Sequence, residues 1–285
     1  MDRPADFEYQ AGQFVQICIP QLSLVEFHPL TLSSAPHESK LTLHVRALGD
    51  WSRRLVQLAA KNKSATIHVG LEGPYGSCAV DLNDDKRYKF VLLVSGGIGV
   101  TPCQSIGKDL LYQHIHKIRR PLKHLRMVWA VRDLQMVHDI PPLEGAAVDQ
   151  KSNGRPSSSL DFTRVDNDVV EVIDSSNTDS NGSPCTQVDI YCTRTNKRDP
   201  EDASLANDAD GAPYRVHYGR PDLDAIFQEI KEAALAAGES NVAVIGCGPM
   251  PLMKDLRECC LVHSSSIVGC QEGIFFDLHT ETFEF

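Results

Sequence analysis

The spacing of apolar residues divides the chain into two parts. In the first part, apolar and polar positions alternate in short runs that contain β-branched residues, which is typical of antiparallel strands buried on one face. These runs cover 14–19, 41–46 and 65–69, and one helical pattern covers 51–60. We therefore expect a small antiparallel barrel or sandwich with one helix.

The second part carries continuous apolar runs that alternate with helical periodicity. Apolar residues at consecutive positions are typical of parallel strands covered on both faces. Such runs lie near 90–94, 125–131 and 242–246, and helical patterns lie near 102–117, 222–237 and 250–261. The sequence predicts an α/β domain over 88–285 after a first domain over 1–82, separated by the polar run 81–87.

A long polar segment interrupts the second part. Residues 145–212 are rich in Ser, Asn, Asp and Gly, so they bury too little apolar surface to offset the entropy lost on ordering. We interpret 145–212 as a largely disordered insertion. Two short apolar runs within it, 169–173 and 188–191, are exceptions. The second fits a strand of the sheet, and the pair would fit a partner-binding element.

Two of the buried runs end in glycine-rich turns. Residues 95–102 are Ser-Gly-Gly-Ile-Gly-Val-Thr-Pro and residues 246–249 are Gly-Cys-Gly-Pro. Glycine permits a tight turn close to a ligand, Thr101 can cap the next helix, and Pro102 suits its first turn. A helix start presents free N–H groups to an anion. For either turn alone a plain strand-to-helix loop is the alternative, but together they favour a phosphate site at one sheet edge.

Composition limits the class of partner. The chain has 285 residues, 42% of them hydrophobic, and its net charge of −10 disfavours nucleic acid and anionic membrane surfaces. No apolar run approaches the roughly 20 residues of a membrane helix, so we expect this chain alone to be soluble. The 9 cysteines include no C-x-x-C pair, which favours reduced thiols and no metal site.

Two polar motifs in the first part offer further chemistry. Thr31 and Ser33 are at alternate positions, so both hydroxyls could face a flat heteroaromatic ring; a polar strand is the alternative. Arg46 precedes a glycine turn and a helix start, and its planar guanidinium suits paired hydrogen bonds to a phosphate. Asp50 or Ser52 would cap that helix.

Six motifs, taken in chain order, make the chain similar to a known family. They are HPLTLSSAP, HVRALGDWS, GPYGS, SGGIGVTP, VHYGRP and CGP. This series resembles the dehydrogenase region of the NADPH oxidase and ferric reductase superfamily, a membrane-tethered branch of the ferredoxin–NADP⁺ reductase fold. The resemblance implies an antiparallel FAD-binding β-barrel followed by a Rossmann-like NADPH-binding domain.

The resemblance also implies binding residues for each cofactor. Those expected at FAD are His28, Pro29, Leu30, Thr31 and Ser33 along the flavin, with Arg46, Trp51 and Ser52 at its phosphates. Those expected at the NADPH pyrophosphate are Gly96, Gly97, Gly99, Val100, Thr101 and Pro102, with Cys247, Gly248 and Pro249 beside the nicotinamide.

Two arginines match family positions at the NADPH ribose and its 2′-phosphate, namely Arg132 and Arg220. Each has an alternative as a structural ion pair. Arg132 would pair with Asp133 or Asp139, and Arg220 would pair with Asp222 or Asp224.

For catalysis, the resemblance implies hydride transfer from NADPH to FAD and one-electron transfer onward to haem and then O₂, giving superoxide. The residues expected at the reacting atoms are Thr31, Cys247 and Phe285. Thr31 or Ser33 would hydrogen-bond flavin N5, and Phe285 would cover the flavin as a lid, with Phe283 second and a docked edge strand as the alternative. A ferric-chelate reductase, a soluble ferredoxin-reductase-like enzyme and a non-catalytic fragment are alternative functions.

The chain departs from the family pattern at its start and at 145–212. It begins inside the flavin domain, so we expect the first strand of 1–82 to be missing, as are the haem-binding membrane helices. We therefore expect a fragment or a truncated gene model. The parent protein would be membrane-associated on the cytosolic side, with a haem-bearing transmembrane domain as a partner and a regulatory partner at 145–212.

Overall fold

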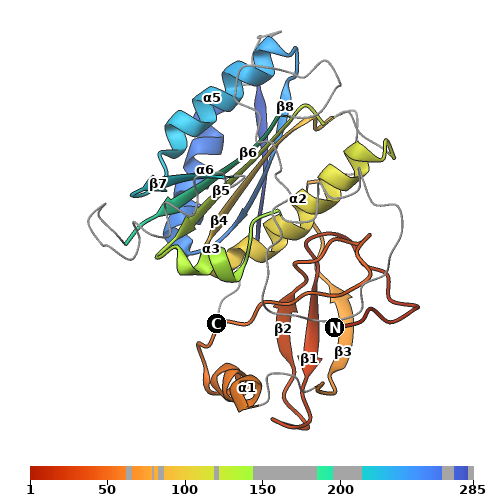
Figure 1. Cartoon of the computed structure of the whole chain (residues 1–285). Coiled ribbons are helices and arrows are strands. Elements are labelled where there is room, and N and C mark those ends of the chain that lie inside the picture. The colour runs from red at the N-terminus through yellow and green to blue at the C-terminus, as the bar shows by residue number, and fades with distance from the viewer. Residues whose placement is uncertain are drawn as a thin grey trace.

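A computed structural model describes residues 1–61, 66–78, 80–82, 87–118, 122–143, 185–194, 214–264 and 273–281. The chain forms a small N-terminal β domain and a larger α/β domain (Figure 1). The expectation of an antiparallel domain followed by a Rossmann-like domain is confirmed.

The N-terminal domain contains a three-stranded antiparallel sheet. β1 (Phe14–Cys18) lies between β2 (His28–Thr31) and β3 (Gly70–Tyr75). Val15 and Ile17 of β1 pack in one core cluster with Trp51, the buried residue of α1 (Asp50–Lys61). The amphipathic helix therefore packs on this domain through Trp51, with Leu55 one turn further along against the same cluster.

The prediction of strands over 41–46 and 65–69 is wrong. Leu43 forms only an isolated bridge with Leu32, and residues 66–69 lie outside the strands. Alternate residues in both segments still pack on the core. Alternation therefore predicts which side is buried, but a loop lying on a core alternates in the same way as a paired strand.

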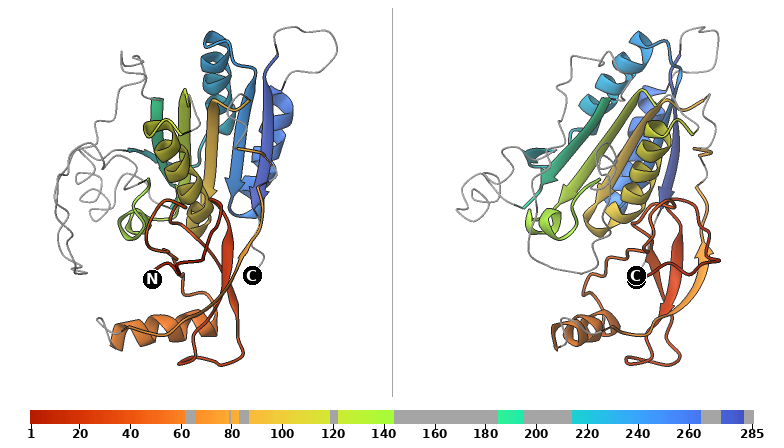
Figure 2. Two further views of the ribbon diagram at one scale, coloured as in Figure 1. Left: turned by 90° about the vertical axis from the view of Figure 1, so that its right-hand side faces the viewer. Right: turned by 45° about the vertical axis from the view of Figure 1, so that its right-hand side comes forward.

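The C-terminal domain is built on a six-stranded parallel sheet of order β7-β6-β5-β4-β8-β9. α2 packs on one face, and α5 and α6 pack on the other (Figures 1 and 2). The strands are β4 (Phe90–Gly96), β5 (His124–Val131), β6 (Cys185–Cys192), β7 (Arg215–Tyr218), β8 (Asn241–Cys247) and β9 (Phe275–Glu281). The helices are α2 (Val100–Ile115), α3 (Gln135–Asp139), α5 (Leu223–Ala236) and α6 (Met250–His263).

β6 corrects the limits of the predicted insertion. Residues 185–192 form a strand between β5 and β7, with Val188, Ile190 and Cys192 buried. The range 145–212 is therefore wrong at this strand, and the strand interpretation of 188–191 is confirmed. The polar composition of the flanks concealed it, because over 186–192 this strand buries only three apolar side chains and one aspartate. The run 169–173 lies outside the described residues.

The strand order reverses between β4 and β8. The chain passes from β4 through β5 and β6 to β7 and then returns to place β8 on the other side of β4. Ligands of open α/β sheets bind at such a reversal, beyond the carboxyl ends of the strands. This edge of the sheet faces the N-terminal domain (Figure 1). None of the helices in the described ranges has the length and apolar character to cross a bilayer.

Candidate functional site

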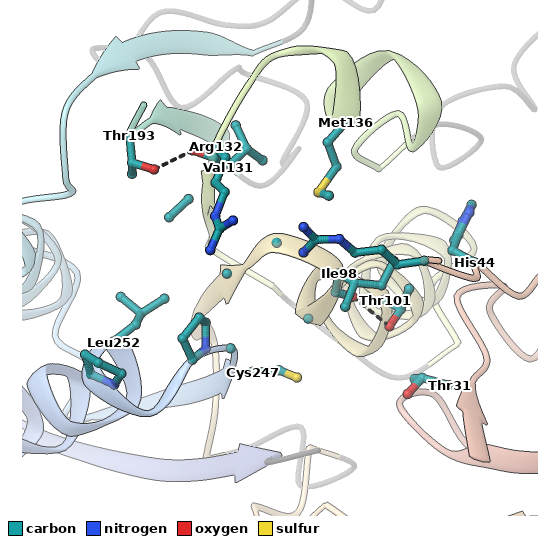
Figure 3. A pocket seen from close by; sticks show the side chains of 18 of the residues that line it. Thr31, His44, Ile98, Thr101, Val131, Arg132, Met136, Thr193, Cys247 and Leu252 are labelled. Carbon is teal, nitrogen blue, oxygen red and sulfur yellow. Dashed lines mark hydrogen bonds between the residues drawn. The ribbon is translucent and has the colours of Figure 1, made fainter. Parts of the chain in front are cut away.

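A cavity of about 1340 Å³ lies between the carboxyl edge of the parallel sheet and the N-terminal domain. Its walls come from β2 and α1 of the first domain and from the ends of β4, β5 and β8 (Figure 3). Pockets for drug-sized ligands measure about 300–1000 Å³. This volume therefore suits a long ligand or two ligands end to end.

The two glycine turns pack against each other at this edge. A Cβ on Gly96 would lie 2.5 Å from Pro249 Cδ, and a Cβ on Gly99 would lie 2.4 Å from the Cys247 carbonyl oxygen. Both positions require glycine because the turns touch. Gly97 differs: its φ is +56°, and its side-chain position is open, with Arg46 Nη1 at 4.0 Å. Gly97 is therefore the position where the turn leaves room for a ligand.

The helix after this turn begins differently from the expectation. Gly97–Gly99 form one turn of 3₁₀ helix and α2 begins at Val100, so Gly99 rather than Thr101 is the N-cap. The Thr101 hydroxyl donates to the Ile98 carbonyl at 3.2 Å (Figure 3). Thr101 lines the cavity, but Val100 and Pro102 are buried outside it. The extra turn rotates these two side chains away from the ligand space.

Three arginines from separate segments reach the cavity. They are Arg46 from the N-terminal domain, Arg132 after β5 and Arg220 after β7. Within the described part of the chain none of them forms an ion pair, although the protein carries a net charge of −10. Unpaired guanidinium groups in one cavity indicate an anionic ligand.

The aspartates named as structural partners of Arg132 and Arg220 do not pair with them. Asp222 Oδ1 accepts from the Ala225 N–H at 3.1 Å and caps α5, and Asp224 Oδ1 lies 3.1 Å from His263 Nε2. Asp139 Oδ1 accepts from Gln135 at 3.1 Å, and Asp133 forms no ion pair among the described residues. The ion-pair alternatives are therefore not what the structure contains.

An aromatic pair forms the wall on the N-terminal domain. The rings of His28 and Trp51 stack with their centroids 4.0 Å apart. His28 Nε2 and Trp51 Nε1 are buried, and neither has a hydrogen-bond partner among the described residues. A buried polar atom without a partner costs about 1–3 kcal/mol. Both residues line the cavity, so the stacked rings form part of its wall.

Ser52 shapes the turn beside this pair. Its hydroxyl oxygen accepts from the Leu48 and Gly49 N–H groups at 3.0 Å each and lies 3.0 Å from the Gly49 carbonyl, to which it donates. The hydroxyl thus holds the turn after Arg46. Ser52, Pro29 and Leu30 all line the cavity.

The two hydroxyl candidates for a ring contact are separated by the structure. Thr31 lines the cavity, whereas Ser33 is buried outside it and donates to the Thr42 carbonyl at 3.1 Å. Ser33 therefore stabilises the fold of this segment, and Thr31 is the hydroxyl available to a ligand. Strand alternation placed both on one face, but β2 ends at Thr31.

Cys247 ends β8 at the opposite wall. Figure 3 shows its sulfur pointing across the cavity toward the side where Thr31 lies. Burial, with a smaller contribution from Glu281, raises the pKa of the Cys247 thiol to about 12. The thiol is therefore protonated and neutral at physiological pH. Gly248 and Pro249 continue the wall.

Some lining residues escaped the sequence analysis, and two candidates lie beyond the structure's description. His44, Met136, Thr193 and Leu252 all line the cavity (Figure 3). Thr193 follows β6, so recognising that strand would have pointed to it. His44 opens the HVRALGDWS motif, in which only Arg46, Trp51 and Ser52 were singled out as binding residues, and Met136 and Leu252 carry no motif signal. Phe285 and Phe283 lie outside the described residues.

Two family models match the chain along almost its whole length. The ferric reductase NAD binding domain matches residues 88–261, and an FAD-binding domain matches residues 1–79. The first covers the parallel sheet up to α6, and the second covers the N-terminal β domain.

Similar proteins include human dual oxidase 2, which is 27% identical over 285 residues, 99% of this chain and 17% of that protein. Rat NADPH oxidase 1 is 28% identical over 271 residues, 92% of this chain and 42% of that protein. The chain thus spans less than half the length of these relatives. A ferredoxin NADP⁺ reductase from Neisseria gonorrhoeae, solved with bound FAD and NADP, shares the fold with a TM-score of 0.54 at 14% identity, over 99% of this chain and 89% of that chain.

Proposed function

Because the chain belongs to the ferric reductase NAD-binding family and carries an FAD-binding domain before it, we propose that it is an NADPH-dependent flavin oxidoreductase of the NADPH oxidase type. The observation that carries this proposal is the convergence of Arg46, Arg132 and Arg220, without ion-pair partners among the described residues, on one cavity between the two domains. Two dinucleotides bring several phosphates into such a space, and the three guanidinium groups would neutralise part of the phosphate charge.

The residues at the N-terminal wall fit FAD. His28 and Trp51 offer a stacked aromatic wall for flat rings, and Arg46 offers a phosphate-binding fork. We assign the flavin side to His28, Pro29, Leu30 and Thr31, and the phosphate side to Arg46, Trp51 and the turn held by Ser52. Ser33 contributes only by holding this segment in place.

The residues at the sheet edge fit NADPH. Gly97 leaves open space beside the start of α2, where free N–H groups favour a pyrophosphate. We assign Arg132 to the ribose and Arg220 to its 2′-phosphate, and Cys247 with Gly248 and Pro249 to the nicotinamide. Gly96 and Gly99 make the two turns fit, and Val100, Thr101 and Pro102 form the helix start.

The protein's contribution to the reaction is position and environment. When bound, NADPH and FAD supply the hydride and one-electron chemistry themselves. Thr31 presents a hydroxyl from one wall, and Cys247 presents a neutral thiol from the other. Both are more than nine-tenths buried, so they exclude water and orient flat rings without adding charge. The chain needs no acid or base of its own for hydride transfer.

We assign 1–82 to the FAD-binding unit and 88–285 to the NADPH-binding unit, with Phe285 as a candidate lid. The similarity to a dual oxidase and an NADPH oxidase supports a haem-bearing membrane domain as the electron acceptor and O₂ as the final one. In that arrangement the chain would work at the cytosolic side of a membrane, and 145–212 would be available to a regulatory partner. The family's ferric reductase description supports ferric chelates as the alternative acceptor.

Anaerobic mixing of the FAD-loaded chain with NADPH tests the proposed activity. The absorbance of oxidised flavin should disappear, because hydride transfer needs no other component. Arg46→Ala should lower FAD retention, whereas Lys61→Ala should not, because Lys61 lies at the last residue of α1, outside the cavity lining. A chain that takes up FAD but is not reduced by NADPH would contradict the proposal.

A further inference from the structure

A buried carboxylate connects three strands on the α5 face of the parallel sheet. Asp189 of β6 is fully buried, and its Oδ2 accepts from Arg126 Nε at 2.9 Å and from Gln187 Nε2 at 2.8 Å. Its Oδ1 lies 2.9 Å from His217 Nε2 on β7. Arg126 of β5 in turn lies 2.5 Å from Glu229 on α5. Asp189 therefore links β5, β7 and, through Arg126, α5.

This network runs diagonally toward the cavity. Arg126 is opposite Gln187 in the sheet, so Asp189 is two residues nearer the carboxyl edge. Asp189 is opposite Arg215, so His217 is two residues nearer again. Arg220, three residues after His217, lines the cavity. The hydrogen-bonded network thus leads from the middle of the sheet toward Arg220, the residue assigned to the 2′-phosphate.

Arg220 follows β7, a short strand whose Val216 and Tyr218 pack against the apolar core. β7 contains only 4 residues and lies at the edge of the sheet, paired on one side with β6. His217 is fixed on that strand by Asp189 and by stacking on Tyr191, with ring centroids 4.6 Å apart. The following Gly219, at φ +107°, donates its N–H to the Cys192 carbonyl at 2.9 Å. The position of Arg220 therefore depends on how firmly β7 is held.

Stability alone does not call for an ion network here. The same face of the sheet buries an apolar cluster under α5 and α6, and buried ion pairs are often no more stabilising than apolar residues of the same size. Charged hydrogen bonds fix the orientation of the side chains that form them, because donor and acceptor must be aligned. Such a constraint suits a strand that must present one side chain accurately.

We propose that Asp189 is a positioning residue that acts through His217 to fix Arg220, and so sets the preference for nicotinamide dinucleotides that carry a 2′-phosphate. This inference rests on the proposed function and specifies which part of the cofactor the network serves. The network touches no ligand itself.

Calorimetric titration of the chain with adenosine 2′,5′-bisphosphate and with 5′-AMP tests this inference without any flavin chemistry. His217→Phe keeps a ring against Tyr191 and removes the hydrogen bond to Asp189. It should weaken bisphosphate binding on the order of tenfold and leave AMP binding unchanged. His217→Gln, whose amide N–H can still donate to Asp189, should lose less. Asp189→Asn, which removes the charge, should reproduce the selective loss.

Glu229→Gln is the matched control, because it removes the charge from the outer partner of Arg126, on the exposed side of α5, and leaves the Asp189–His217 contact intact. It should bind both ligands as the unmodified chain does. Equal loss of both ligands in His217→Phe, or no loss, would overturn the inference while leaving the proposed function in place. Failure of the unmodified chain to bind the bisphosphate would overturn both. If Asp189→Asn does not fold, the two His217 variants decide.

Discussion

At the scale of single residues, the cavity brings together three arginines that have no carboxylate partner among the described residues. Arg126 and the lysines at 89 and 123 are also cationic and lie in the same domain, but each is paired with a carboxylate. Arg132 and Arg220 have no such partner among the described residues, and both open onto the cavity. Their cationic character therefore remains available to a ligand.

Replacing Arg220 by alanine should discriminate between the two nicotinamide dinucleotides. A hydrogen bond to a charged group contributes about 1.5–3 kcal/mol, so NADPH binding should weaken roughly 10- to 100-fold. NADH binding should stay within about twofold, a change of ~0.4 kcal/mol. Titration of Arg220→Ala with both ligands measures this. Arg257→Ala is the control, since Arg257 bonds to Thr280 outside the cavity lining. Equal losses for NADPH and NADH would remove Arg220 from the 2′-phosphate.

His124 should make the fold sensitive to acid. Burial, helped by the nearby Arg126, lowers the pKa of His124 from 6.5 to about 4. The unfolded chain therefore takes up a proton first, and the stability that this residue contributes is complete above pH 6.5 and is lost as the pH falls toward 4. Between pH 7 and pH 5 the loss should be about 2 kcal/mol.

Urea unfolding of the unmodified chain and of His124→Gln at pH 7 and pH 5 separates this effect from that of the carboxylates. Glutamine does not titrate, so the free energy of unfolding of the variant should change less between the two pH values. An identical pH dependence in both proteins would show that His124 is not the titrating group.

Motifs identify a segment near the site, but they do not tell which of its side chains line the cavity. Ser33, Val100 and Pro102 belong to the same short motifs as Thr31, Gly97 and Thr101, yet they lie outside the cavity. The difference arises because β2 ends at Thr31 and because one 3₁₀ turn precedes α2. Neither feature leaves a distinct mark on residue type, so the sequence predicted the segment and not the individual contacts.

At the scale of elements, the strand–turn–helix units of the second domain were predictable. The helices expected over 102–117, 222–237 and 250–261 differ from α2, α5 and α6 by at most two residues at either end. Buried parallel strands are apolar throughout and helices repeat every 3.6 residues, so the two periods differ clearly. The first domain lacks this contrast, and two of its expected strands are not strands.

Gly99 and Gly97 have different roles in the first turn, close packing and open ligand space, and substitutions should separate them. Gly99→Ala places a Cβ 2.4 Å from the Cys247 carbonyl oxygen, so the β4 and β8 turns must move apart. The expected loss in free energy of unfolding is on the order of 3 kcal/mol. Gly97→Ala meets no close atom but forces alanine to a φ of +56°, at a cost of about 1 kcal/mol.

Urea unfolding and NADP⁺ titration of both variants check this distinction. Gly97→Ala should keep most of its stability yet bind NADP⁺ more weakly, because its methyl group enters the open ligand space. If Gly99→Ala is as stable as the unmodified chain, the contact between the turns is not what requires glycine there.

At the scale of the whole molecule, the cavity exists because two domains meet. Ser105 of α2 donates to the Ser34 carbonyl at 2.7 Å and accepts from the Gly12 N–H at 3.2 Å. These contacts fix the N-terminal domain beneath the carboxyl edge of the sheet, where Arg46 approaches Gly97. Sequence motifs indicated two cofactor sites separately. Their union in one cavity depends on side-chain packing between domains, which no local pattern encodes.

The central claim is that this one cavity holds FAD and a nicotinamide dinucleotide together. Calorimetric titration of the chain with NADP⁺, first alone and then after saturation with FAD, tests it most directly. The claim predicts one FAD and one NADP⁺ per chain, with NADP⁺ binding retained after FAD saturation. Competition, in which FAD abolishes NADP⁺ binding, would contradict it, because the three arginines would then serve a single ligand.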